Sequence, residues 1–64
     1  MPAIHIAEER LGMENILEYR ENEEGRSARG KCKCPECGEI VPFSACSDVA
    51  GVWVFCTKDG MLDY

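Results

Sequence analysis

The chain has 64 residues and a formal net charge of −5 at pH 7, with seven lysines and arginines against twelve acidic residues. A chain of this length buries only about 60% of its unfolded surface, so disulfides, a metal or a partner usually stabilise it. The net negative charge contrasts with the overall positive charge that is typical of a nucleic-acid-binding domain.

Five cysteines indicate which kind of stabilisation to expect. The number is odd, so a complete disulfide framework would leave one thiol unpaired. The N-terminal sequence MPAIHIAEER lacks the basic and apolar regions of a signal peptide, and no apolar run approaches the roughly 20 residues that cross a bilayer. We therefore expect one cytoplasmic domain, residues 1 to 64, whose reduced thiols bind a metal and which has no membrane partner.

Residues 1 to 25 form an acidic N-terminal segment with seven acids and two bases. Within it, residues 7 to 22 (AEERLGMENILEYREN) are rich in helix formers, and Met13, Ile16 and Leu17 follow the i, i+3, i+4 spacing. We expect a helix here. The alternative is a hairpin in which ILEYR pairs with RSARGKCKC around the turn ENEEG.

Residues 26 to 33 (RSARGKCK) form a basic joint that contains no acid. The favoured interpretation is a solvated linker that the acidic segment partly neutralises, because no aromatic residues are interleaved with the bases. The alternative is a nucleic-acid contact. Its candidate residues are Arg26, Arg29, Lys31 and Lys33.

The sequence becomes strand-like after residue 31, and VWVFC is the strongest strand pattern. A hairpin over residues 39 to 55 would have its tip near residues 46 and 47. Trp53 and Phe55 share one face of their strand by parity, opposite the face of Cys56. We expect Trp53 and Phe55 to face the core beneath the N-terminal segment, because a small domain can hardly spare its only tryptophan. The alternative is an exposed protein-docking patch.

Two pentapeptides carry the chemistry of the chain, CPECG at residues 34 to 38 and CTKDG at residues 56 to 60. In the first, proline presets φ for a tight turn and glycine supplies a positive φ, so that two thiolates can face one ion. The second has the same shape, with Asp59 in the place of the second cysteine. Sulfur-rich tetrahedral sites suit zinc or iron.

These motifs resemble the zinc ribbons, a family in which two turns at hairpin tips grip one zinc ion. The resemblance covers residues 31 to 64 and departs from the family at Asp59, where the family has cysteine. The resemblance implies a zinc-stabilised β-ribbon and a structural metal, and no single activity. Together with the pattern of residues 1 to 25, we expect a small α+β fold, with a C-terminal zinc-stabilised β-ribbon and an N-terminal helical or hairpin segment.

The fourth metal ligand is open from the sequence alone. Asp59 ranks first, because it follows Cys56 at the spacing that separates the two cysteines of the first turn, and carboxylate is an acceptable zinc ligand. Cys46 and Cys32 come next, although the expected hairpin puts Cys46 far from the metal. His5 and water rank last. The expected ligands of one Zn²⁺ ion are Cys34, Cys37, Cys56 and Asp59.

The function expected from these features is non-enzymatic. No nucleophile stands beside a base at a recognisable spacing, and a chain of this size offers little wall for a substrate pocket. We expect a zinc-binding module that docks on a larger protein or protein complex, for example in gene expression. The first alternative is a ribbon that binds nucleic acid through residues 26 to 33, and the second is a rubredoxin-like iron electron carrier.

Overall fold

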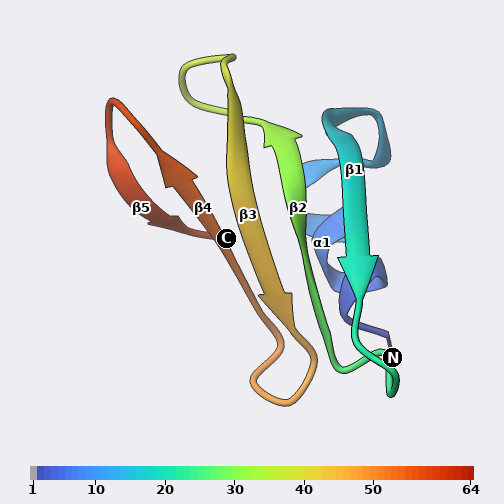
Figure 1. Cartoon of the computed structure of the whole chain (residues 1–64). Coiled ribbons are helices and arrows are strands. Elements are labelled where there is room, and N and C mark those ends of the chain that lie inside the picture. The colour runs from blue at the N-terminus through green and yellow to red at the C-terminus, as the bar shows by residue number, and fades with distance from the viewer. Residues whose placement is uncertain (1) are drawn as a thin grey trace.

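The structure is a computed structural model that describes residues 2 to 64. Within these residues, five strands form one antiparallel sheet in which each strand pairs with the next along the chain, in the order β1-β2-β3-β4-β5. In the same described part of the chain, one α-helix precedes the sheet and lies across one of its faces (Figure 1). The elements are α1 (Ala3–Leu11), a 3-10 turn η1 (Met13–Asn15), β1 (Ile16–Glu21), β2 (Ser27–Lys33), β3 (Ile40–Cys46), β4 (Gly51–Cys56) and β5 (Gly60–Asp63).

The core lies between α1 and the sheet. Alternate residues of β2, β3 and β4 are buried, as expected for a sheet with one covered face. Phe43 of β3 is the largest fully buried side chain and is only 2% exposed. The other buried positions are Ala3, Ile4, Ile6, Ala7 and Leu11 of the helix, and Ala28, Cys32, Val41, Ala45, Val52, Val54 and Cys56 of the strands, with Cys34 just after β2.

The expected fold class, a small α+β chain with a separate C-terminal ribbon, is wrong. The chain is mostly sheet, and a strand from its N-terminal part belongs to the same sheet as the cysteine turns. The preferred helix over residues 7 to 22 is also wrong beyond its first residues. Gly12 has a φ of 93°, which ends α1, and residues 16 to 21 pair with β2 as in the hairpin alternative.

The apolar residues that suggested a longer helix are mostly exposed in the structure. Met13 is 67% exposed and Leu17 is 54% exposed, whereas Ile16 packs partly against the core. Helix propensity is a weak preference that tertiary pairing overrides. The backbone hydrogen bonds that β1 makes with β2 therefore decide the conformation of this segment.

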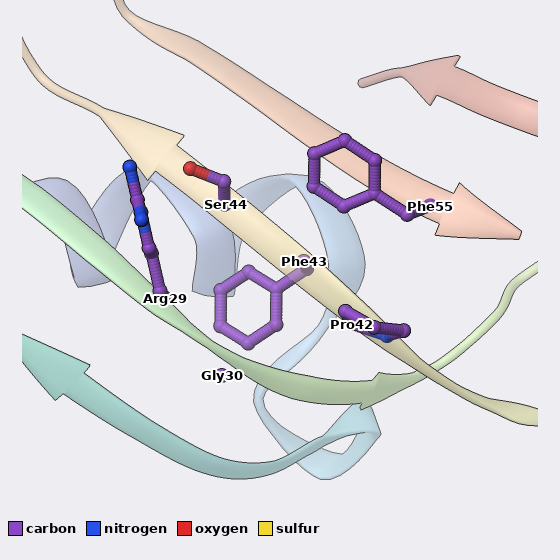
Figure 2. A pocket seen from close by; sticks show the side chains of 6 residues that line it. All are labelled: Arg29, Gly30, Pro42, Phe43, Ser44 and Phe55. Atoms are coloured by element: carbon purple, nitrogen blue, oxygen red, sulfur yellow. The ribbon is translucent and has the colours of Figure 1, made fainter.

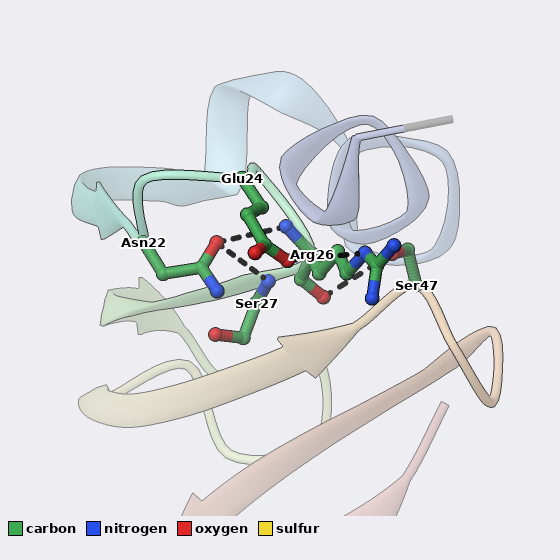
Figure 3. Close-up of polar contacts among 5 residues, drawn as sticks. All are labelled: Asn22, Glu24, Arg26, Ser27 and Ser47. Carbon is green, nitrogen blue, oxygen red and sulfur yellow. Dashed lines mark hydrogen bonds and ion pairs between the residues drawn. The ribbon is translucent and has the colours of Figure 1, made fainter.

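The basic joint is not a linker, because residues 27 to 33 form β2, which pairs with a strand on each side. The turn before it is held by side chains (Figure 3). Asn22 Oδ1 accepts hydrogen bonds from the backbone N–H groups of Arg26 at 2.8 Å and Ser27 at 3.3 Å. Arg26 pairs with Glu24 at 3.3 Å, and its carbonyl accepts from the Ser47 N–H at 2.8 Å. Arg26 thus belongs to the turn between β1 and β2, and its side chain is exposed.

The expectation that Trp53 and Phe55 face the core is wrong as well. The helix covers the face that carries Val52, Val54 and Cys56, so the side of β4 that carries Cys56 is also its core side. Phe55 is 41% exposed and Trp53 is partly buried, both on the uncovered face. Within residues 2 to 64, the helices are too short or too polar to span a membrane.

Candidate metal centre

The first cysteine turn joins β2 to β3. The Cys34 N–H donates to the carbonyl of Glu39 at 2.8 Å, and the Gly38 N–H donates to the carbonyl of Cys34 at 2.8 Å. Gly38 has a φ of 78°, which a residue with a Cβ adopts only at a cost. The local sequence therefore closes this turn through backbone bonds and brings its two cysteines together.

The second turn joins β4 to β5. Cys56 pairs across the ladder with Gly60, whose φ is 75°, and residues 57 to 59 lie between them. Because successive strands are antiparallel, the β2–β3 and β4–β5 connections lie at the same end of the sheet (Figure 1). Side chains join the two turns: Thr57 Oγ1 donates to Glu39 Oε2 at 3.4 Å, and Lys58 Nζ lies 3.4 Å from Glu39 Oε1.

The sulfur atoms of Cys34, Cys37 and Cys56 all lie within 4.8 Å of one another. The Cys37 and Cys56 sulfurs are 3.3 Å apart. In a tetrahedral zinc site with Zn–S bonds of about 2.3 Å, neighbouring sulfurs are separated by about 3.8 Å. Cys34 and Cys56 are buried and Cys37 is partly buried. This group of three cysteines can therefore hold a metal ion.

The thiols of this cluster do not ionise independently. Burial raises the pKa of Cys34, but hydrogen bonds from the backbone of Cys37 and Glu36 and from neighbouring thiols lower it by more, so the net direction is down. A hydrogen bond from the Glu39 backbone lowers the pKa of Cys37, but the Cys56 thiol, burial and the charge at Cys34 raise it to about 11. The negative charge of one thiolate thus raises the pKa of a neighbouring thiol. A bound cation would offset this repulsion between thiolates.

Asp59 lies beside the cluster. Its Oδ2 atom accepts from the Cys56 sulfur at 3.8 Å. A sulfur and an oxygen that share one tetrahedral zinc would be about 3.6 Å apart. Asp59 does not belong to the group whose ligand atoms all lie within 4.8 Å, so it is close to Cys56 but farther from at least one other sulfur. The side chain is therefore next to the centre without completing it in this conformation.

The other ligand candidates lie elsewhere. Cys32 is fully buried in β2, where burial and then the charge at Cys34 raise its pKa to about 11. Cys46 ends β3 opposite Gly51, at the end of the hairpin that is remote from the cysteine turns. His5 is exposed on α1 beside Glu8. Among residues 2 to 64, the cluster of three cysteines is the group of three or more potential ligands found at metal-binding spacing.

Tyr64 lies beside the first turn, which the sequence did not indicate. Its hydroxyl donates to Glu36 Oε1 at 3.0 Å, its N–H donates to the carbonyl of Val52 at 2.8 Å, and its carbonyl accepts from Arg10 at 2.5 Å. Burial, then Glu36 and the charges at Cys34 and Asp59, raise the pKa of Tyr64 to about 12. No local pattern could have found these contacts, because the partners are 12 to 54 residues away in the chain.

The structure separates the four basic residues that were candidates for a nucleic-acid contact. Arg26 lies in the turn before β2, whereas the alternation of β2 puts Arg29, Lys31 and Lys33 on its exposed side. That side faces away from α1, since the covered positions of β2 are Ala28 and Cys32. Three of the four predicted contacts therefore share one surface.

Comparison with known proteins found no matching protein-family model, no matching curated protein and no matching solved structure.

Proposed function

We propose that the chain binds one Zn²⁺ ion through Cys34, Cys37, Cys56 and Asp59, and that this ion fastens the ends of two hairpins to each other. The observation that carries the proposal is the convergence of three thiols from two separate turns within 4.8 Å. Asp59 is the nearest candidate for the fourth position, at 3.8 Å from the Cys56 sulfur. Rotation of its side chain toward the ion would complete a closed tetrahedral site.

The donor set favours zinc over iron. A rubredoxin-like iron centre would need a fourth thiolate. Cys32 is fully buried in the core, and Cys46 stands at the opposite end of the β3–β4 hairpin. A site with three thiolates and one carboxylate suits zinc, which accepts sulfur and oxygen ligands.

The proposed role of the metal is structural. A core built from one nine-residue helix and one sheet supplies only a few kcal/mol, whereas structural zinc contributes roughly 10–16 kcal/mol of apparent binding free energy in small domains. Three surface hollows of about 330 to 360 Å³ are lined by residues other than the three cysteines. These features support a non-enzymatic binding module that resembles a zinc ribbon at its cysteine turns, and the five free cysteines support a reducing compartment such as the cytoplasm.

The partner of such a module has to be sought on its surface. The sequence favoured a larger protein or protein complex over a nucleic acid. Basic and aromatic side chains on the uncovered sheet face support a nucleic acid instead, because the basic residues of β2 and the rings of β4 share this face with only β3 between them.

Zinc content and metal-dependent folding test this proposal. The purified chain should contain one zinc per molecule by native mass spectrometry, and cobalt substitution should give the visible absorption of tetrahedral thiolate ligands. A chelator should collapse the dispersed amide NMR signals of the sheet. Cys56→Ser should behave as the chelated protein does, whereas the control Cys46→Ser should keep its zinc. A dispersed spectrum after verified removal of the metal would refute the structural role, and bound iron would refute the choice of zinc.

A further inference from the structure

The face of the sheet that α1 leaves uncovered, hereafter the open face, has a charge opposite to that of the rest of the chain. Alternation and strand register put four bases and two acids on it. The remainder of the chain holds three bases and ten acids. The open face thus carries +2 and the remainder −7, which makes this face the surface suited to an anionic partner. Its charged residues are Glu18, Arg20, Arg29, Lys31, Lys33 and Asp63.

Two arginines on this face stand directly opposite each other. Arg20 of β1 and Arg29 of β2 are cross-strand partners. Like charges in this position destabilise a sheet. In residues 2 to 64 the ion pairs within 4.0 Å are those of Arg26 and Lys58, so neither of the two opposed arginines is neutralised by one. An anion bound between them would relieve the repulsion.

Aromatic side chains lie on the part of the open face that β4 forms, across β3 from the arginines. Phe55 of β4 is 41% exposed, and its cross-strand partner Met61 is 61% exposed. Trp53 lies two residues away, over Gly51, where an added Cβ would come within 2.8 Å of the indole. The indole therefore extends along the strand toward Gly51, and Phe55 follows Trp53 on the same face in the other direction along β4.

A shallow hollow connects the basic and the aromatic sides. It has a volume of about 360 Å³, and Figure 2 shows Arg29 and Phe55 on either side of β3, with Pro42 and Ser44 between them. The small side chain of Ser44 stands opposite both Arg29 and Trp53 in the strand register. β2 and β4 both pair with β3, so they are two interstrand spacings apart. The basic side chains of β2 and the aromatic side chains of β4 therefore form two parallel rows about 10 Å apart.

We propose that the open face binds single-stranded nucleic acid, with bases stacked on Phe55 and Trp53 and with phosphates beside Arg29, Arg20 and Lys31. This polymer repeats an anionic group on one side and a planar apolar group on the other, which matches the two rows. Base stacking on aromatic side chains beside a positively charged groove is the general means by which proteins hold single strands. A duplex would leave Phe55 without a base, and an acidic peptide would engage the arginines without a planar group for the ring.

The inference names the partner of the binding module proposed above, and it depends on the sheet rather than on the identity of the metal. Its test uses the full chain as purified, with metal content and amide dispersion measured on the same sample. Fluorescein-labelled dT and rU oligonucleotides of about twelve nucleotides are titrated by anisotropy, since single-strand sites span roughly 4–16 nucleotides. The matched probes are the same length of duplex DNA and a labelled poly-glutamate peptide.

Two matched pairs of variants locate the site. Phe55→Ala should weaken binding of the single strand at least about fivefold, while Tyr19→Ala, which removes a 51% exposed ring from the other side of the sheet, should not. Arg29→Gln should weaken binding and make the slope of log affinity against log salt concentration shallower by about 0.7 for each phosphate that Arg29 neutralises. Arg26→Gln should leave both the affinity and the slope unchanged. Fluorescence of Trp53, the only tryptophan, should be quenched by the oligonucleotide.

Several results would overturn the inference. A folded sample that binds no oligonucleotide at low salt refutes it, as does tighter binding of poly-glutamate or of a second copy of the chain. Equal binding of duplex and single strand refutes the stacking. Equal losses in the two aromatic variants, or in the two arginine variants, would place the site elsewhere. A metal-free sample that is folded and still binds the single strand would refute the structural role of the metal and leave this inference standing.

Discussion

Replacement of Asp59 by alanine is expected to weaken zinc binding by more than about 100-fold, without unfolding the zinc-saturated protein. The oxygen lies 3.8 Å from the Cys56 sulfur, close to the roughly 3.6 Å that two ligands of one tetrahedral zinc would show. Removing the side chain would leave three thiolates and a water molecule. The change alters no backbone turn, because Gly60 next to it keeps the positive φ that ends the loop.

The size of the effect follows from where Asp59 lies. Loss of a group that only orients a ligand costs roughly 10–100-fold in metal affinity, so loss of a ligand itself should exceed this range. Asp59→Asn keeps the shape and removes the negative charge, and should fall between the parent and Asp59→Ala. Cys46→Ser is the control, because Cys46 lies at the far end of the β3–β4 hairpin.

The assay is competition for zinc with a chromophoric chelator at constant pH, on samples whose fold is verified by amide dispersion. If Asp59→Ala binds zinc within a few-fold of the parent while Cys46→Ser loses most of its affinity, the position of Asp59 in the second turn has no bearing on the metal. Equal losses in both variants would show a general effect on the fold instead of a ligand.

Three further outcomes are expected. Phe43→Ala should lower the free energy of unfolding by about 3–5 kcal/mol in urea titrations, because Phe43 is only 2% exposed, and a loss below 1 kcal/mol would contradict its place in the core. The metal-free Cys37 thiol has a pKa of about 11 and is therefore protonated at pH 6 to 8, so zinc must displace its proton. The zinc affinity should then rise at least about tenfold per pH unit, and a zinc affinity that does not change with pH would contradict this. Gly51→Ala should displace the Trp53 indole, which would lie 2.8 Å from the new Cβ, and shift its fluorescence while changing stability by under about 1 kcal/mol.

Local motifs account for the parts of the structure that the sequence determined by itself. CPECG closes through backbone hydrogen bonds between Cys34, Gly38 and Glu39, and needs no distant partner to bring two cysteines together. The β3–β4 hairpin follows from its apolar alternation, and its tip at residues 47 to 50 leaves Cys46 remote from the two cysteine turns, as expected. Turn chemistry and side-chain parity are encoded within a few residues, so a single sequence reveals them.

The tertiary structure decided the rest. Residues 16 to 21 carry helix formers, but become a strand because β2 offers a free edge for pairing. Parity groups Trp53 with Phe55 but does not say which face α1 will cover, and the helix packs on the side of Val52 and Val54. The opposition of Arg20 and Arg29 likewise exists only once the register is set. Each of these features depends on contacts between residues that are distant in the chain. The free energy of such contacts cannot be read from a local sequence pattern.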